Sequence, residues 1–228
     1  MLKLAAAALI GAGTVFAATT ATGPAAPKFQ TERGFVIHDQ ASAPAETREV
    51  LDWYVDNVGF VPNLGGIMAE SPALSRSYWQ LQVNLQNDNS LSPPEDNIVQ
   101  MAIAVANECQ YCTAGHTMAG RMFFRAPEAQ LQALRKQSAL PEAKFNALRD
   151  FALAVHETRG QVSESHLRDF YEAGYTRRNA LDVVANVASK VMSNYTNWIA
   201  QTPIDAPLKP LAEGLPFAED YRAVPVTH

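Results

Sequence analysis

"LSPPEDNIVQMAIAVANECQYCTAGH", residues 91–116, is the stretch that decides the fold of this chain. Ser92 and Glu95 lie three residues apart around two prolines, which is the pattern of a helix capping box. The run that follows, IVQMAIAVA, is apolar on nearly every side and therefore predicts a buried helix. The two cysteines of the chain, Cys109 and Cys112, come next, with His116 four residues further on.

Helix signals recur on both sides of this stretch, whereas strand signals are nearly absent. A proline or a hydroxyl side chain precedes the apolar repeats, as is typical of helix N-termini. These predicted helix starts are Pro44, Ser71, Ser92, Pro127, Pro141, Ser163 and Thr176. The last predicted helix is long and carries Leu181, Val184, Val187, Val191 and Tyr195. We therefore expect an all-α single domain of about seven or eight helices in antiparallel pairs.

The two ends of the chain differ from this helical part. Residues 1–17 place Lys3 before a short apolar run and a small-residue cleavage triplet, which is the layout of a secretory signal peptide. We expect residues 18–44 to form a flexible lead-in, residues 45–206 the helical domain, and residues 207–228 an extended tail. The expected location is periplasmic or secreted, with no stable membrane insertion after cleavage, and a disulfide persists in such compartments.

The charge of the chain argues against one class of partner. It has 18 Lys and Arg against 23 Asp and Glu, a net charge of −5, with no run of basic residues. Nucleic-acid binding proteins carry a basic patch or stripe instead. We therefore predict no nucleic-acid partner and no electrostatic attachment to membranes.

On a single helix, the two cysteines and the histidine share one face. Cys112 and His116 are about 40° apart at the i, i+4 spacing, where helix side chains touch, so His116 is the candidate acid/base for Cys112. Glu108 lies four residues before Cys112, at a similar angle. If a helix begins near Asn107, its dipole also favours a thiolate in the first turn. Cys109 is two turns from His116 and reaches it less easily.

Three interpretations of this pattern compete. A redox-active dithiol uses Cys-x-x-Cys geometry to lower a thiol pKa. A zinc site needs a fourth ligand beyond two cysteines and one histidine, and the chain offers no second cysteine pair. A structural disulfide over so short a loop removes little entropy from the unfolded chain. The spacing favours redox chemistry without cofactor or metal, and the alternative is a non-enzymatic helical oligomer whose cysteines form a structural disulfide or metal site.

The stretches "LSPPEDNIVQMAIAVAN" and "ECQYCTAGH" resemble the signature of the AhpD-like, or carboxymuconolactone decarboxylase, family. Further segments, "VGFVPNLGGIMAESPAL" and "SNYTNWIAQTPID", are similar to its peroxidase-related branch. The resemblance implies an AhpD-like helical fold, a homo-oligomer (trimer or hexamer), and a peroxidase that cycles through a disulfide with an unknown thiol reductant. It also implies roles: Cys112 attacks the peroxide, Cys109 resolves the sulfenic acid, and His116 relays the proton.

The chain departs from the family pattern at the relay carboxylate. The position twelve residues before the first cysteine holds Asn97, which cannot relay a proton. Glu95, Asp96 and Glu108 are nearby carboxylates, and we prefer Glu108 as the replacement because of its spacing from Cys112. Tyr111 stands where better-studied members have a further histidine.

Two other groups bear on the site. Asn194, Tyr195 and Asn197 are expected to be buried hydrogen-bonding groups on the last helix, with a lesser prospect that they line the site. Phe123 and Phe124 follow the motif and could wall the thiol pocket, which would suit an organic peroxide.

Overall fold

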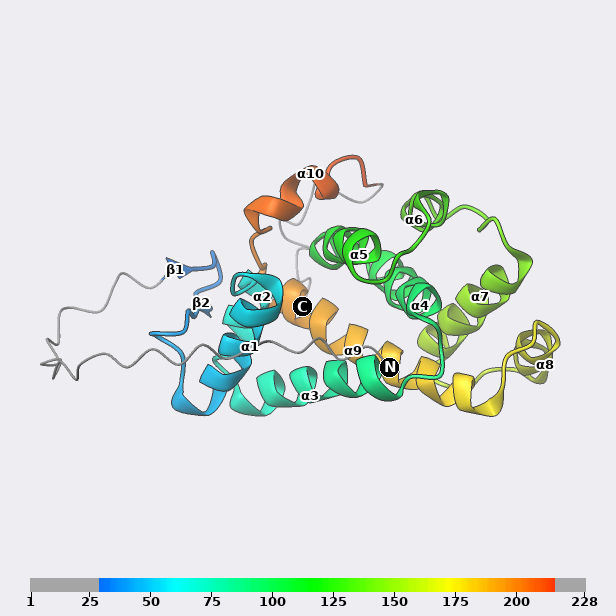
Figure 1. Ribbon diagram of the computed structural model, residues 1–228, viewed down its shortest axis with the longest axis horizontal. Helices are drawn as coiled ribbons and strands as arrows, with labels where there is room; N and C mark the ends of the chain where they lie inside the picture. Colours follow the sequence, from blue (N-terminus) through cyan, green and yellow to red (C-terminus); the bar gives the residue numbers. More distant parts are fainter. Residues whose placement is uncertain (1–28, 216–228) are drawn as a thin grey trace, which may run out of the picture.

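The helical prediction is confirmed by the computed structural model, which describes residues 29–215 (Figure 1). In that part of the chain the α-helices are α1 Arg48–Val58, α2 Asn63–Met68, α3 Pro72–Asp88, α4 Pro93–Ala106, α5 Gln110–Met122, α6 Glu128–Arg135, α7 Ala143–Glu157, α8 Glu164–Glu172, α9 Arg177–Ala200 and α10 Lys209–Ala212. Eight of them have eight residues or more and correspond to the helices expected. The short helices α2 and α10 were not expected.

The helix α4 is the centre of the arrangement. It contacts α5, α6, α7 and α9, and Figure 1 shows α4, α5 and α9 lying between α3 on one side and α10 on the other. The predicted capping box begins it: the Ser92 backbone N–H donates to Glu95 Oε2 at 2.9 Å. Its residues from Glu95 to Val105 are all buried, as the apolar run predicted.

A continuous apolar core lies where α4 meets α7 and α8. We call it the apolar core; its largest members include Ile98, Leu148, Phe151 and Phe170. The rings of Phe151 and Phe170 stack with centroids 4.2 Å apart. Because burial of such side chains is the main favourable contribution to folding, this region anchors the domain.

The chain turns sharply between α4 and α5. The N–H of Cys109 donates to the carbonyl of Ala104, and that of Glu108 to Val105, both at 2.9 Å. This is a Schellman motif, which needs a left-handed residue just past the helix end, usually glycine. Here Glu108 occupies that position with φ = 52°. Asn107 is thus the C-cap of α4, and Cys109 is the N-cap of α5. A break between two helices, which the sequence left open near Asn107, is present at this point.

Both predicted end regions need correction within the described residues. Phe29–Gln30 and Val36–Ile37 pair as antiparallel strands β1 and β2, so the expected flexible lead-in is ordered there. His38 then donates its backbone N–H to Gly66 in α2, which fixes the hairpin on the domain. In the expected extended tail, the chain instead forms α10, which packs on α5. The predicted signal peptide, residues 1–17, lies outside the described residues.

Within residues 29–215, no helix is both long and apolar enough to cross a membrane.

Candidate functional site

The two cysteines lie at the start of α5. Cys109 is the N-cap, and its sulfur accepts a hydrogen bond from the backbone N–H of Cys112 at 3.4 Å. Cys112 is therefore in the first turn, where the helix dipole favours a negative charge. Both are buried thiols, with exposed fractions of 0% and 4%.

The helix α9 turns a polar face toward these sulfurs. The side-chain amide of Asn197 donates to Cys112 Sγ at 3.1 Å and to Cys109 Sγ at 3.6 Å. Ser193 also hydrogen-bonds Cys112, and Lys190 adds a positive charge nearby. Lys190, Ser193 and Asn197 follow the i, i+3, i+7 spacing of a single helix face, and each has an exposed fraction of 1% or less.

The electrostatics separate the two thiols. Burial alone would raise the pKa of Cys112, but a hydrogen bond from the Cys109 thiol and the charge of Lys190 oppose it. Together with the hydrogen bonds from Ser193 and Asn197, they lower the pKa of Cys112 to about 6. Burial and the neighbouring sulfur raise the pKa of Cys109 well above its usual value. Near neutral pH the arrangement favours a Cys112 thiolate that accepts a hydrogen bond from the Cys109 thiol.

His116 lies in the site but has a different partner from the one predicted. Its Nε2 contacts Lys190 Nζ, and its buried Nδ1 has no hydrogen-bond partner among residues 29–215. Burial, and then the charge of Lys190, lower the pKa of His116 well below its usual value. The direct thiol–imidazole hydrogen bond suggested by the i, i+4 spacing is not present in this part of the chain. His116 is a neutral imidazole beside Lys190.

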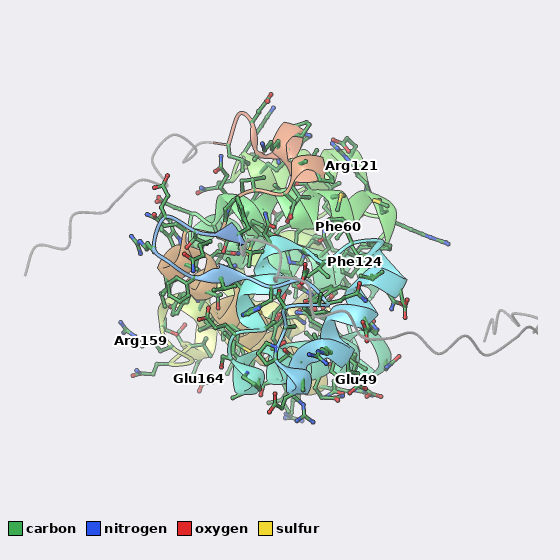
Figure 2. All side chains as sticks on the ribbon, turned by 90° about the vertical axis from the view of Figure 1, so that its left-hand side faces the viewer. Glu49, Phe60, Arg121, Phe124, Arg159 and Glu164 are labelled. Atoms are coloured by element: carbon green, nitrogen blue, oxygen red, sulfur yellow. The ribbon has the colours of Figure 1, made fainter. Side chains whose placement is uncertain are left out.

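A pocket of about 370 Å³ opens onto one of the two thiols. Cys112, His116 and Lys190 line it, whereas Cys109 does not. Much of its wall is aromatic and comes from α1, α3 and the segments after α1 and α5: Trp53, Tyr54, Phe60, Tyr78, Phe123 and Phe124. Figure 2 labels Phe60 and Phe124, which lie near each other beside α5. Phe123 and Phe124, which the sequence suggested could wall the thiol pocket, are among its lining residues.

Glu108 lies apart from these groups. It precedes α5 in the left-handed turn and is exposed, so it does not share a helix face with Cys112 as the spacing argument assumed. The assumption was wrong because α4 ends at this point and α5 begins only after Cys109. No contact of Glu108 supports the role assigned to it.

Asn97 and Asp96 are both buried in α4, with different surroundings. The Asn97 amide contacts Met101 Sδ at 3.5 Å and lies against Gly120, where an added Cβ would come within 2.7 Å of it. Asn97 therefore fills space between α4 and α5. Asp96 accepts hydrogen bonds from Asn89 at 2.5 Å and Gln100 at 2.8 Å. Burial raises the pKa of Asp96 to about 6.

Tyr111 lines the pocket and holds neighbouring segments of the chain together. Its hydroxyl donates to Asp205 and accepts from the backbone N–H of Leu64 at 3.3 Å. Asp205 in turn accepts from the backbone N–H of Asn63 at 3.1 Å, so this cluster joins α5 to the start of α2. Tyr111 thus has a hydrogen-bonded structural position.

The sequence reasoning missed Lys190 and Ser193. A signal for them exists: Asn186, Ser189, Lys190, Ser193 and Asn197 form a polar stripe at helical spacing along α9. Asn197 was anticipated as a buried group and contacts both sulfurs. Within residues 29–215, no cluster of three or more His, Cys, Asp or Glu side chains could hold a metal ion.

Comparisons with known proteins fit this description. The alkylhydroperoxidase AhpD core protein from Ralstonia eutropha JMP134, a peroxidase-related protein, superposes with a TM-score of 0.67 and 23% identity over 75% of this chain and 92% of that one. A peroxidase-related protein from Silicibacter sp. TM1040 gives a TM-score of 0.65 and 19% identity over 82% of this chain and 97% of that one. A cysteine-to-alanine variant of the debrominase Bmp8, in complex with 2,3,4-tribromopyrrole, gives a TM-score of 0.65 and 18% identity over 81% of this chain and 97% of that one.

The chain has an AhpD-like, all-α fold that carries two buried thiols. Residues 72–157, which include both cysteines, match the sequence profile of the carboxymuconolactone decarboxylase family. This match agrees with the resemblance to that family that the sequence indicated. A comparison with curated protein sequences gave no significant match.

Proposed function

We propose that this protein is a thiol-dependent peroxidase of the alkylhydroperoxidase type. The observation that carries the proposal is the unequal placement of the two sulfurs. Cys112 lines the pocket and has a pKa of about 6, whereas Cys109 lies behind it with a raised pKa. A thiolate is the form that attacks peroxides, and a neighbouring thiol resolves the product.

The proposed catalytic cycle consists of attack on the peroxide, disulfide formation and reduction. The Cys112 thiolate attacks one peroxide oxygen, the O–O bond breaks, and the departing alkoxide takes a proton to become an alcohol. The sulfenic acid on Cys112 then condenses with the Cys109 thiol to give a disulfide and water. An external dithiol returns both sulfurs to thiols. His116, which lines the same pocket, is the proposed proton donor to the alkoxide.

The test is stopped-flow thiol loss with hydrogen peroxide and with cumene hydroperoxide on reduced protein. We expect Cys112→Ser to abolish the reaction and Cys109→Ser to stop at a sulfenic acid that dimedone traps. Turnover with thioredoxin, glutathione or dihydrolipoamide identifies the reductant class. Reaction of Cys112→Ser at the wild-type rate would contradict the assignment of Cys112. Stoichiometric zinc in the purified protein would instead favour the non-enzymatic alternative.

A second candidate is reductive dehalogenation of a halogenated aromatic compound. The aromatic wall of the pocket favours a flat apolar substrate, and the similar Bmp8 structure holds 2,3,4-tribromopyrrole. In this reaction two thiols become a disulfide while a C–Br bond is replaced by C–H and hydrogen bromide leaves. Bromide release from 2,3,4-tribromopyrrole, equal in amount to disulfide formed, tests it. Release at the rate of the Cys112→Ser variant would exclude it.

The proposal includes export and self-association. The layout of residues 1–17 supports export, and N-terminal sequencing of protein from a periplasmic fraction tests it. An exposed apolar row on α9 supports a homo-oligomer; Leu181 and Ile199 there are 71% and 58% exposed. Light scattering at two protein concentrations tests this, with the trimer or hexamer as the expected mass.

A further inference from the structure

Lys190 is an unusual residue for its position in the fold. Among the buried side chains of residues 29–215 it is the only lysine or arginine, with an exposed fraction of 1%. Lysine is rarely buried unless it has a partner. It lines the pocket beside His116, and its Nζ contacts His116 Nε2. Because burying an ammonium group is costly, we infer that Lys190 serves the thiol pocket that it lines.

Hydrogen-bond chemistry fixes the direction of the Lys190–His116 contact. A lysine ammonium has three donors and no acceptor, so the imidazole nitrogen that faces it must accept. The proton of neutral His116 then lies on Nδ1. That Nδ1 is buried and without a hydrogen-bond partner in the described part of the chain. His116 therefore keeps a donor available within the site.

Several ionisable groups face Lys190 from the elements around it. From α5 these are Cys112, Cys109 and His116, and from α4 it is Asp96. Tyr78 of α3 lines the same pocket, and α2 has no ionisable side chain. On α7, Lys144 pairs with Glu95, Arg149 with Asp150, and His156 with Asn107. Burial lowers the pKa of Lys190, whereas the nearby sulfurs and Asp96 oppose that shift. Lys190 is the cation of this site, with the Cys112 thiolate and the Asp96 carboxyl group as its counter-charges.

We propose that Lys190 is a positioning residue of the thiol site: its ammonium group keeps the Cys112 sulfur ionised and holds His116 with Nδ1–H as the free donor. This inference rests on the proposed function, in which Cys112 is the attacking thiol. A cation near a thiol favours the thiolate, and a fixed tautomer places a proton where a leaving alkoxide can take it. It also removes the need for a carboxylate at Asn97.

The proton balance of the first step follows from this arrangement. When the Cys112 sulfur takes an oxygen from the peroxide, the alkoxide takes the Nδ1 proton of His116, and Lys190 passes a proton to Nε2. The neutral amine then accepts the proton of the Cys109 thiol, whose sulfur displaces hydroxide from the sulfenic acid. The disulfide forms, the hydroxide takes a proton from solvent to become water, and Lys190 is again charged. Exchange with solvent then returns the His116 proton from Nε2 to Nδ1.

The experiment compares Lys190→Met, which removes the charge but keeps the length, with Lys190→Arg, which keeps the charge. Lys136→Met is the matched control, because Lys136 is exposed and outside the pocket. The readout is the rate of Cys112 alkylation by iodoacetamide against pH, with the modified cysteine assigned by mass spectrometry. We expect Lys190→Met to move the pH midpoint of alkylation upward by about one unit or more. Lys190→Arg should keep the midpoint close to that of the wild type, and Lys136→Met should leave it unchanged. A folded Lys190→Met variant with an unmoved midpoint overturns the inference.

A second measurement uses the unmodified protein, so it does not depend on a variant that folds. The ¹⁵N shifts of the His116 ring near neutral pH report its tautomer. We expect the Nδ1–H form; the Nε2–H form or an imidazolium would overturn the inference. Neither readout needs peroxide turnover. A protein without peroxidase activity would contradict the proposed function and still leave the role of Lys190 open to this test.

Discussion

Two buried regions of the molecule are built from different chemistry, although α4 packs against the helices of both. The apolar core contains Ile98 of α4 with Leu148 and Phe170, and its side chains are hydrophobic, although Tyr175 carries a hydroxyl that donates to Glu95. The thiol core, which we define as Cys109, Cys112, His116 and the inner face of α9 (Lys190, Ser193, Asn197), is dense in polar groups.

In residues 29–215, some polar atoms of the thiol core have no hydrogen-bond partner, whereas the apolar core contains few polar atoms. Within the described residues, His116 Nδ1 and Asn197 Oδ1 are buried without a hydrogen-bond partner. Such a group costs about 1–3 kcal/mol of folding free energy. Stability and thiol chemistry therefore depend on separate regions. A substitution in the apolar core should leave the thiol chemistry nearly unaffected, and a substitution in the thiol core should leave the stability nearly unaffected.

The largest effect is expected in the apolar core. Leu148 is fully buried, and Leu148→Ala should lower the free energy of unfolding by about 4 kcal/mol, because it removes buried methyl groups and leaves a cavity. The pH midpoint of Cys112 alkylation should stay where it is. Urea unfolding measures the first quantity and iodoacetamide the second. A moved midpoint would show that the two regions are coupled.

Asp96, which is buried in α4, makes the free energy of unfolding depend on pH. Its pKa is raised to about 6, so the folded state holds the proton more tightly than the unfolded chain. The stabilisation is fully present below the usual aspartate pKa and is lost as pH rises through about 6. For a shift of about two units this amounts to about 3 kcal/mol.

We therefore expect Asp96→Asn to flatten the fall in stability between about pH 4 and pH 7. The new amide has an acceptor ready, because Gln100 Oε1 has no hydrogen-bond partner in the described part of the chain and the Gln100 amide can flip. Urea midpoints across that range measure the effect, and Asp150→Asn on exposed α7 surface is the control. Parallel curves for wild type and Asp96→Asn would refute it.

Asn197→Ala should have a smaller effect, confined to the thiol core. It removes the amide that donates to both sulfurs, so the pKa of Cys112 should rise by about one unit, worth about 1.4 kcal/mol. Thiolate absorbance at 240 nm against pH measures the shift. Asn194→Ala is the matched control, because Asn194 is equally buried on α9 but bonds Asn107 instead of sulfur. Equal shifts in both variants would mean that the amide donor is not the cause.

A substitution at Glu108 tests whether this residue serves the turn between α4 and α5 or relays a proton. Because Glu108 holds a left-handed conformation that glycine adopts without strain, Glu108→Gly should raise the free energy of unfolding by about 1 kcal/mol. Peroxide reactivity of Cys112 should not change. A loss of reactivity greater than tenfold would restore the relay role that its spacing suggested.

The sequence was informative where local chemistry decides structure. The capping box at Ser92 and the helix cap at Thr176 are formed as predicted, and the apolar run between the capping box and the cysteines is buried. The spacing of the cysteines and His116 correctly brought these residues into one site. It failed at Glu108 because one left-handed residue separates two helices, and no propensity marks a glutamate for that conformation.

The orientation of α9 was the other feature that local reasoning could not supply. An amphipathic helix normally buries its apolar stripe, yet here Leu181, Val184 and Tyr195 are exposed while the polar stripe is inside. The choice depends on what the facing helix α5 carries, namely two thiols and a histidine. Lys190 was missed for this reason, since a lysine on a long helix is usually solvated.

The smallest effect is expected on the outer face of α9. Leu181 is 71% exposed, so Leu181→Gln in the monomer should change the free energy of unfolding by less than about 0.5 kcal/mol. The matched control is Val183→Ala, two residues on and fully buried, which should cost several times more. If Leu181→Gln instead lowers stability by about 2 kcal/mol in a way that depends on protein concentration, the outer face is covered by a second copy. In that case the apolar stripe of α9 is buried after all, by association, and the polarity of this helix is inverted only within the single chain.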